Sequence, residues 1–120
     1  MSELKDNVVS LETAKTLVDA GIVVESYFCF RKWKNSESWY LRETLIIEFY
    51  EKQIPAPTFS ELWQQIPTQR NFILDIDEVD GQMVVTILDR LGNELFQRSN
   101  KLPQEALAEI LIQLKKEGLI

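Results

Sequence analysis

The chain has 120 residues, of which 45% are hydrophobic, and this is typical of one globular domain with a packed core rather than of a disordered segment. It has no histidine and one cysteine, Cys29, so histidine-based nucleophile pairs, the usual zinc sites and internal disulfides cannot be built from this chain alone. With 19 acidic and 13 basic residues the net charge is −6, which disfavours general binding to a phosphate backbone and suits solubility or a basic partner.

The sequence shows no segment for a membrane or for secretion. No apolar run approaches the roughly 20 residues that span a bilayer, and Met1–Asp6 is polar and charged. We therefore expect a cytoplasmic protein in a reducing compartment. We also expect a single domain over residues 1–120, because no linker, repeat or low-complexity tract interrupts it.

A short amphipathic helix is predicted near the start of the chain. Ser10 is a suitable N-cap, and Gly21 can take the left-handed conformation that follows a helix C-terminus. Between them the apolar residues that share one face are Leu11, Ala14, Leu17 and Val18. A helix of this length is marginal alone, so we expect it to dock on the rest of the domain.

Two β-prone runs follow this helix. Tyr27–Lys34 is rich in aromatic residues and predicts a strand, and the polar run Asn35–Ser38 predicts a turn. Whether Trp39–Tyr50 forms one strand or two pieces stays open; its most apolar part is Leu45–Tyr50. Pro55-Ala56-Pro57 ends any strand there, because proline cannot donate to a ladder.

The strongest local signal lies at Thr58-Phe59-Ser60-Glu61. It fits the capping box, in which the threonine hydroxyl accepts the backbone N–H three residues on and the glutamate reaches back. Pro67 is expected to terminate this short helix. Its apolar face consists of Phe59, Leu62, Trp63 and Ile66.

A hairpin is predicted next, because Asn71–Val79 and Gln82–Leu88 flank Asp80-Gly81, a dipeptide that fits a type I′ turn. The expected cross-strand partners are Ile76 with Val85 and Leu74 with Ile87 on the inner surface, and Asp75 with Thr86 and Asp77 with Val84 on a surface that meets water. A turn over Asp89–Asn93 then leads to a third strand, Glu94–Arg98.

Pro103 opens the last predicted helix, and Gly118 ends it. Its apolar face consists of Leu107, Ile110, Leu111 and Leu114. Ile112 lies off this stripe, where it either broadens the core face or contacts a second subunit. The element order α-β-β-α-β-β-β-α, without βαβ alternation, predicts an α+β fold: a small antiparallel sheet with helices packed on one face.

Three segments of the chain resemble a family of small uncharacterised proteins from phages, prophages and other bacterial mobile elements. They are the opening Val9-Ser10-Leu11-Glu12-Thr13-Ala14 with Leu17 and Gly21, the segment Ala56-Pro57-Thr58 with Leu62 and Trp63, and the closing Glu105-Ala106-Leu107 with Leu111. The chain departs from the family pattern at Pro55, where a Tyr-Ser pair is usual. The resemblance implies a compact α+β domain and brings no catalytic residues or cofactor.

Metal binding is not expected. Asp75–Gly81 looks briefly like a calcium loop, but Val79 falls where a ligand is needed, Asp80 where glycine is needed and Thr86 where glutamate is needed. Cys29 lies within an apolar strand and is expected to be a small buried side chain rather than a reactive thiol. We therefore expect no metal and no cofactor.

Ten of the 12 aromatic residues lie between Tyr27 and Trp63, which is more than the rest of the chain uses for packing. Most should be core, but those that flank the polar turn after the first strand are candidates for an exposed recognition patch. With nearby cations, the candidate binding residues are Arg31, Trp33, Trp39, Tyr40 and Arg42. The alternative is an ordinary strand whose cations simply face solvent.

Three hypotheses about function follow. The first is a non-enzymatic protein-interaction module of phage or prophage type. The second is a small-ligand or single-stranded nucleic-acid binding module that uses the same rings with basic side chains, although the net charge makes nucleic acid an unfavourable partner. The third is an enzyme built on carboxylates such as Glu43, Glu48 and Asp75, for which the sequence shows no converging geometry.

Overall fold

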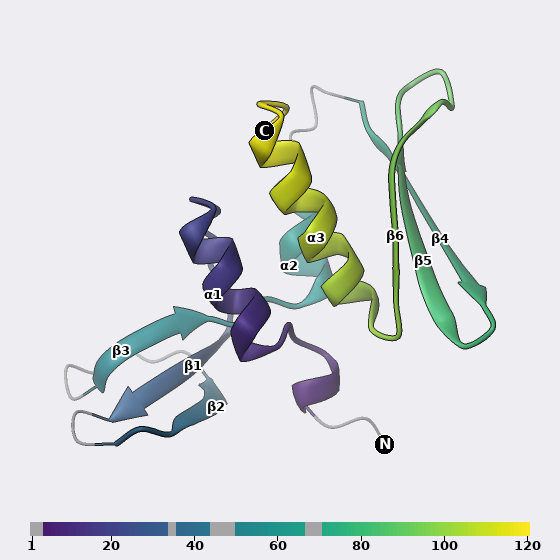
Figure 1. Ribbon diagram of the computed structural model, residues 1–120. Helices are drawn as coiled ribbons and strands as arrows, with labels where there is room; N and C mark the ends of the chain where they lie inside the picture. Colours follow the sequence, from purple (N-terminus) through teal and green to yellow (C-terminus); the bar gives the residue numbers. More distant parts are fainter. Residues whose placement is uncertain (1–3, 34–35, 44–49, 67–70) are drawn as a thin grey trace.

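The computed structural model describes residues 4–33, 36–43, 50–66 and 71–120. After a 3-10 turn at Leu4–Asp6, the elements are α1 (Leu11–Asp19), β1 (Phe28–Trp33), β2 (Trp39–Glu43), β3 (Tyr50–Pro55), α2 (Phe59–Trp63), β4 (Ile73–Val79), β5 (Gln82–Leu88), β6 (Glu94–Asn100) and α3 (Pro103–Lys116). Figure 1 shows the helices between two separate groups of strands. The α+β class with antiparallel strands is confirmed.

The strands form two three-stranded sheets, so the single sheet expected from the sequence is wrong. The first sheet has the order β2-β1-β3 and the second β4-β5-β6, and all neighbours are antiparallel. Of the two alternatives left open for Trp39–Tyr50, the structure has the one with two strands: β2 ends at Glu43, and β3 begins at Tyr50. The apolar residues between them lie outside the described residues. Pro55 is the last residue of β3, and α2 then separates it from β4. Among the described strands, β4, β5 and β6 pair with one another and not with the first sheet.

The predicted β4–β5 hairpin is confirmed, including its register. Asp80 and Gly81 both have positive φ, 52° and 81°, as a type I′ turn requires. The inner pairs are Ile76 with Val85 and Leu74 with Ile87, and the outer pairs are Asp75 with Thr86 and Asp77 with Val84. One residue of the outer surface is shielded from solvent, however. Thr86 is buried, and its hydroxyl oxygen accepts a hydrogen bond from the Gln97 side chain of β6 (3.1 Å).

Helix α3 is the centre of the core. It contacts α1, α2, β5 and β6, and it therefore buries residues around much of its circumference. The fully buried members on this helix are Ala106, Leu107, Ala108, Ile110, Leu111 and Leu114. Ile112 packs against the same core, as the first of its two predicted roles requires.

The two shorter helices begin where the sequence predicts. Ser10 caps α1 and Gly21 follows it with a φ of 80°, while Thr58 and Glu61 form both bonds of the capping box on α2. The buried face of α1 is narrower than the sequence predicts, because Val18 is 51% exposed. Ala14 and Leu17 make up its buried part, since this nine-residue helix lies at the rim of the core.

Candidate binding surfaces

Two of the three aromatic residues predicted to form one patch on the first hairpin lie on different faces of the sheet. Trp39 and Tyr40 are adjacent in β2, where they pair with Lys32 and Arg31 of β1. Successive side chains of a strand point to opposite faces of the sheet. The single recognition patch of the sequence analysis is therefore not assembled by the described residues of this hairpin.

Each of these two rings lies beside a cation. The Lys15 Nζ of α1 is 5.2 Å from the centroid of the half-buried Trp39 ring, and the Arg42 Cζ is 5.6 Å from that of Tyr40. Both distances fit cation–π contacts. Tyr40 and Arg42 remain exposed on β2, an edge strand, whereas the side chain of Trp33 lies outside the described residues.

Arg31 is buried, and the expectation of a surface cation at this position is wrong. It is only 4% exposed, and its Nη2 donates to the Glu43 carbonyl oxygen. The long side chain of arginine lets it pack within a sheet while its head reaches a backbone acceptor. Arg31 therefore stabilises the β1–β2 pair. Cys29, on the same strand, is buried as predicted.

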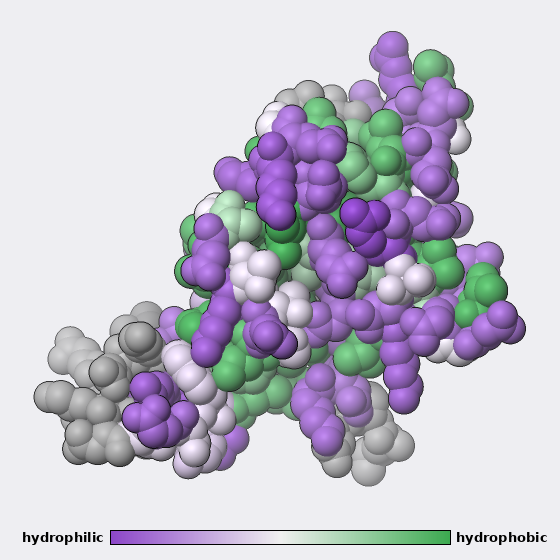
Figure 2. Space-filling model, in the orientation of Figure 1, coloured by the Kyte–Doolittle hydropathy of each residue, from purple (hydrophilic) through white to green (hydrophobic). Residues whose placement is uncertain are grey.

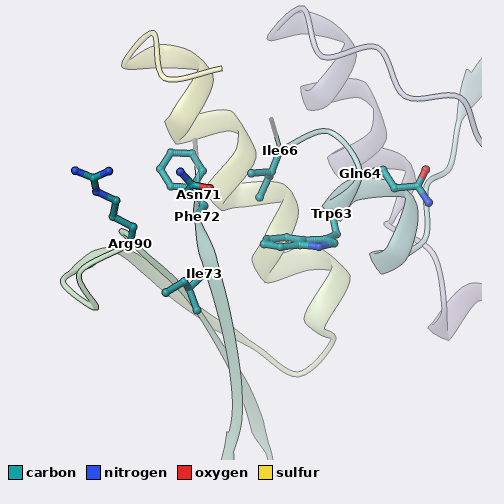
Figure 3. Close-up of a pocket in the computed structure, with 7 residues that line it drawn as sticks. All are labelled: Trp63, Gln64, Ile66, Asn71, Phe72, Ile73 and Arg90. Carbon is teal, nitrogen blue, oxygen red and sulfur yellow. The ribbon is translucent and has the colours of Figure 1, made fainter. Parts of the chain in front are cut away.

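A cavity of about 730 Å³ lies between α2 and the start of β4 (Figure 3). Trp63 and Ile66 line it from the side of α2, and Phe72 and Ile73 line it from the side of β4. Arg90 lines it from the turn between β5 and β6, with its guanidinium directed away from Trp63. Gln64 and Asn71 are the other described residues of the lining.

The described side chains around this cavity are mostly apolar. The described lining consists of aromatic and aliphatic side chains, two amides and one guanidinium, with no carboxylate or thiol. The sequence analysis missed this cavity, because its walls belong to segments that a periodicity pattern does not bring together.

The strand β4 presents the other unusual surface. It lies at one edge of the second sheet and, with the exception of Leu74, all its residues are exposed. Nine large apolar side chains of the described residues are exposed, and five of them belong to this sheet and its turns: Ile73, Ile76, Val79, Leu91 and Leu95. Figure 2 shows apolar atoms among hydrophilic ones over the β4–β5 hairpin, at the right of the view.

Other kinds of site find little support in the part of the chain that the structure describes. No three Asp, Glu or Cys side chains come together there in a way that could hold a metal ion. None of the described helices is both long and apolar enough to cross a membrane. The carboxylates proposed for an enzyme lie apart: Glu43 and Asp75 belong to different sheets, and Glu48 lies outside the described residues.

Comparisons with known proteins add no family. No protein-family model, no curated protein and no solved structure matches this chain. Its surfaces therefore have to be interpreted from their own chemistry.

Proposed function

We propose that this protein acts by binding another protein, without catalysis of its own, and that β4 and the adjoining outer surface of the second sheet are the contact surface. The observation that carries this proposal is the exposure of β4 on both faces and at its free edge, with Ile73, Ile76 and Val79 each at least 42% exposed. We place this activity in the cytoplasm, in keeping with the single, buried Cys29.

An edge strand of this kind is a template for pairing. Among the described strands, β5 alone pairs with it, on its other edge, and its apolar side chains are left in water. Helix α3 contacts β5 and β6, so the inner face of the sheet is covered there, while β4 extends beyond that cover (Figure 1). Binding a partner at β4 would bury the apolar side chains that folding leaves exposed.

Site-specific photo-crosslinking in a host-cell lysate tests this function. A photoreactive residue at Asp77 should give discrete products with another protein, and the same residue at the exposed Glu12 of α1 should not. Replacing Ile73 and Val79 with serine should reduce the Asp77 products several-fold. Identical products from both positions, or none from Asp77, would count against the proposal.

A second candidate function is small-ligand binding in the cavity beside α2. Its volume lies within the range of about 300–1,000 Å³ that is typical of ligand pockets, and Trp63 lies in its wall. Titration with small aromatic acids should change tryptophan fluorescence in the wild type and leave a Trp63→Phe variant unchanged. Equal changes in both proteins would place the binding elsewhere.

The remaining expectations from the sequence stay predictions. The resemblance to phage and prophage proteins suggests a mobile-element accessory factor, and the exposed pair of Tyr40 and Arg42 could add a smaller contact on β2. For single-stranded nucleic acid the described hairpin offers a weaker surface, since Arg31 is buried and the two rings of β2 point to opposite faces.

A further inference from the structure

Resting on the function proposed above, we propose that the segment bound at β4 is an extended stretch of the partner in which basic and apolar side chains alternate, added as a fourth strand beside β4. The backbone direction, the side-chain pattern and the charge of β4 all point to this occupant.

Every second residue of β4 directs its backbone groups toward the free edge. The two residues that flank a two-residue turn, here Val79 and Gln82, form a hydrogen-bonded pair. Hydrogen-bonded pairs alternate along an antiparallel ladder, so the backbone groups of Val79, Asp77, Asp75 and Ile73 point toward β5. The backbone groups of Leu74, Ile76 and Glu78 therefore point outward. The Glu78 N–H donates to the Asp77 carboxylate (2.9 Å), which fits this direction and leaves Leu74 and Ile76 as the pairing positions.

The side chains of β4 specify what should lie opposite them. On the outer face Asp75 and Asp77 lie between Ile73 and Val79, and all four are exposed. On the inner face Ile76 is 42% exposed. Cross-strand pairs of opposite charge and pairs of apolar residues both stabilise a sheet. A strand with basic side chains toward the two aspartates and apolar side chains beside Ile76 would satisfy both faces.

The β4–β5 hairpin carries acidic side chains and no basic side chains of its own. From Ile73 to Leu88 the sequence has four acidic residues, Asp75, Asp77, Glu78 and Asp80, and no lysine or arginine. The whole chain adds to this field with its net charge of −6. A basic segment would therefore be attracted on approach and would neutralise the hairpin once paired, whereas an acidic or neutral segment would not.

The same charges disfavour a second copy of this chain as the occupant. In an antiparallel β4–β4 pair centred on Ile76, each Asp75 would lie opposite an Asp77 of the other copy. If the pair were centred on Asp75 instead, Asp75 would lie opposite Asp75 of the other copy. A pair centred on Asp77 would likewise place two copies of Asp77 opposite each other. Like charges directly opposite each other destabilise a sheet, so the edge favours a different, basic chain.

Three synthetic nine-residue peptides test the proposal against the ¹⁵N-labelled full chain by NMR. One alternates lysine and valine, one alternates glutamate and valine, and one holds the lysines and valines of the first in two blocks. The alternating lysine peptide should shift the amide signals of Leu74 and Ile76 and slow their hydrogen exchange. The Asp75→Asn, Asp77→Asn double variant should bind it roughly 2- to 30-fold more weakly, as the loss of two cross-strand ion pairs implies.

The charge-reversed variant, Asp75→Lys with Asp77→Lys, provides the matched control. Both side chains are exposed, so this variant should fold and should prefer the glutamate peptide. Equal binding of the blocked lysine peptide, or unchanged hydrogen exchange at Leu74 and Ile76, would overturn strand addition. If no peptide binds while the Asp77 crosslinks persist, the partner chemistry is wrong and the proposed function stands; if both fail, both are wrong.

Discussion

Gln104 connects the first turn of α3 to the N-terminal segment through two hydrogen bonds. Its side chain is 3% exposed, and its Nε2 donates to the carbonyl oxygens of Asp6 (2.8 Å) and Val8 (3.1 Å). Replacing Gln104 with alanine should lower the free energy of unfolding by about 1–3 kcal/mol, because a buried carbonyl loses its partner. Urea denaturation measures this loss.

The same helix supplies the control for this prediction. The Gln113 amide also donates a hydrogen bond, but to the exposed Glu117 one turn later. Gln113→Ala should therefore change the unfolding free energy by no more than about 0.5 kcal/mol. Equal losses in the two variants would show that the bonds of Gln104 have no special role.

Asp89 organises the turn between β5 and β6. Its carboxylate accepts the backbone N–H groups of Leu91 and Asn93, both at 2.9 Å, and the side-chain amide of Asn93 at 3.2 Å. These bonds, with that from the Asn93 backbone the largest, lower the pKa of Asp89 below its ordinary value of 3.8, although burial opposes them.

The lowered pKa of Asp89 predicts how the stability of this turn depends on pH. The stabilisation from a carboxylate whose pKa falls on folding is present above its unfolded pKa and is lost as the pH falls through its folded pKa. The difference in melting temperature between the wild type and Asp89→Ala should thus be constant from pH 7 to about 5 and should shrink below about pH 4. A difference that stays constant down to pH 2 would show that the carboxylate charge is irrelevant.

Helix α2 shows how a very short element is held in place. It has five residues, and both bonds of its capping box are formed: Thr58 Oγ1 accepts the Glu61 N–H at 3.3 Å and Glu61 accepts the Thr58 N–H at 2.9 Å. The same Glu61 carboxylate also accepts the Ser26 hydroxyl (2.7 Å) and the Tyr27 N–H (3.0 Å). One side chain thus caps α2 and anchors the segment that enters β1.

Substitutions in this capping box should rank in a defined order. Thr58→Ala should lower the unfolding free energy by about 1 kcal/mol, as is usual for the loss of an N-cap. Glu61→Ala should lower it further, because it also removes the bonds to Ser26 and Tyr27. Ser60→Ala is the control within the helix. Thermal unfolding measures all three, and a smaller loss for Glu61→Ala than for Thr58→Ala would contradict the anchoring role.

Helix ends and tight turns could be predicted because each depends on a few neighbouring residues. Contacts between residues far apart in the sequence could not be predicted. The cap at Thr58 and the turn at Asp80-Gly81 are set by a few adjacent residues, so sequence alone placed them. The division into two sheets and the second role of Glu61 depend on partners about 20 to 35 residues away.

The candidate sites were less predictable for the same reason. Aromatic density drew attention to the first hairpin, yet strand alternation places Trp39 and Tyr40 on opposite faces. Arg31 illustrates a further limit, because no sequence pattern distinguishes a buried arginine from an exposed one. The acidic edge of β4 was visible in the sequence as a water-facing surface, but its position at the edge of a sheet was not.

At the scale of the whole molecule the two sheets contribute unequally to the core. Val85 and Ile87 of β5 are fully buried in the same cluster as α3. The first sheet, among its described residues, adds only the partly buried Phe30 and Ile54 to that cluster. The molecule is also elongated, with extents of 51 × 32 × 19 Å, and the sheets lie on different sides of the helices (Figure 1). We therefore expect the first sheet to open more readily than the second.

Native-state hydrogen exchange of the two sheets tests this difference. The hydrogen-bonded amides of β5 should exchange only through global unfolding, whereas those between β1 and β2 should exchange through a local opening of lower free energy. Ile87→Val should lower the exchange free energy of the β5 amides by about 0.5–1.5 kcal/mol and leave that of the β1–β2 amides unchanged. An equal decrease in both sheets would mean that they unfold as one cooperative unit. In that case, binding at β4 would stabilise both sheets. If the first sheet opens separately, as we expect, binding at β4 leaves the free energy of that opening unchanged.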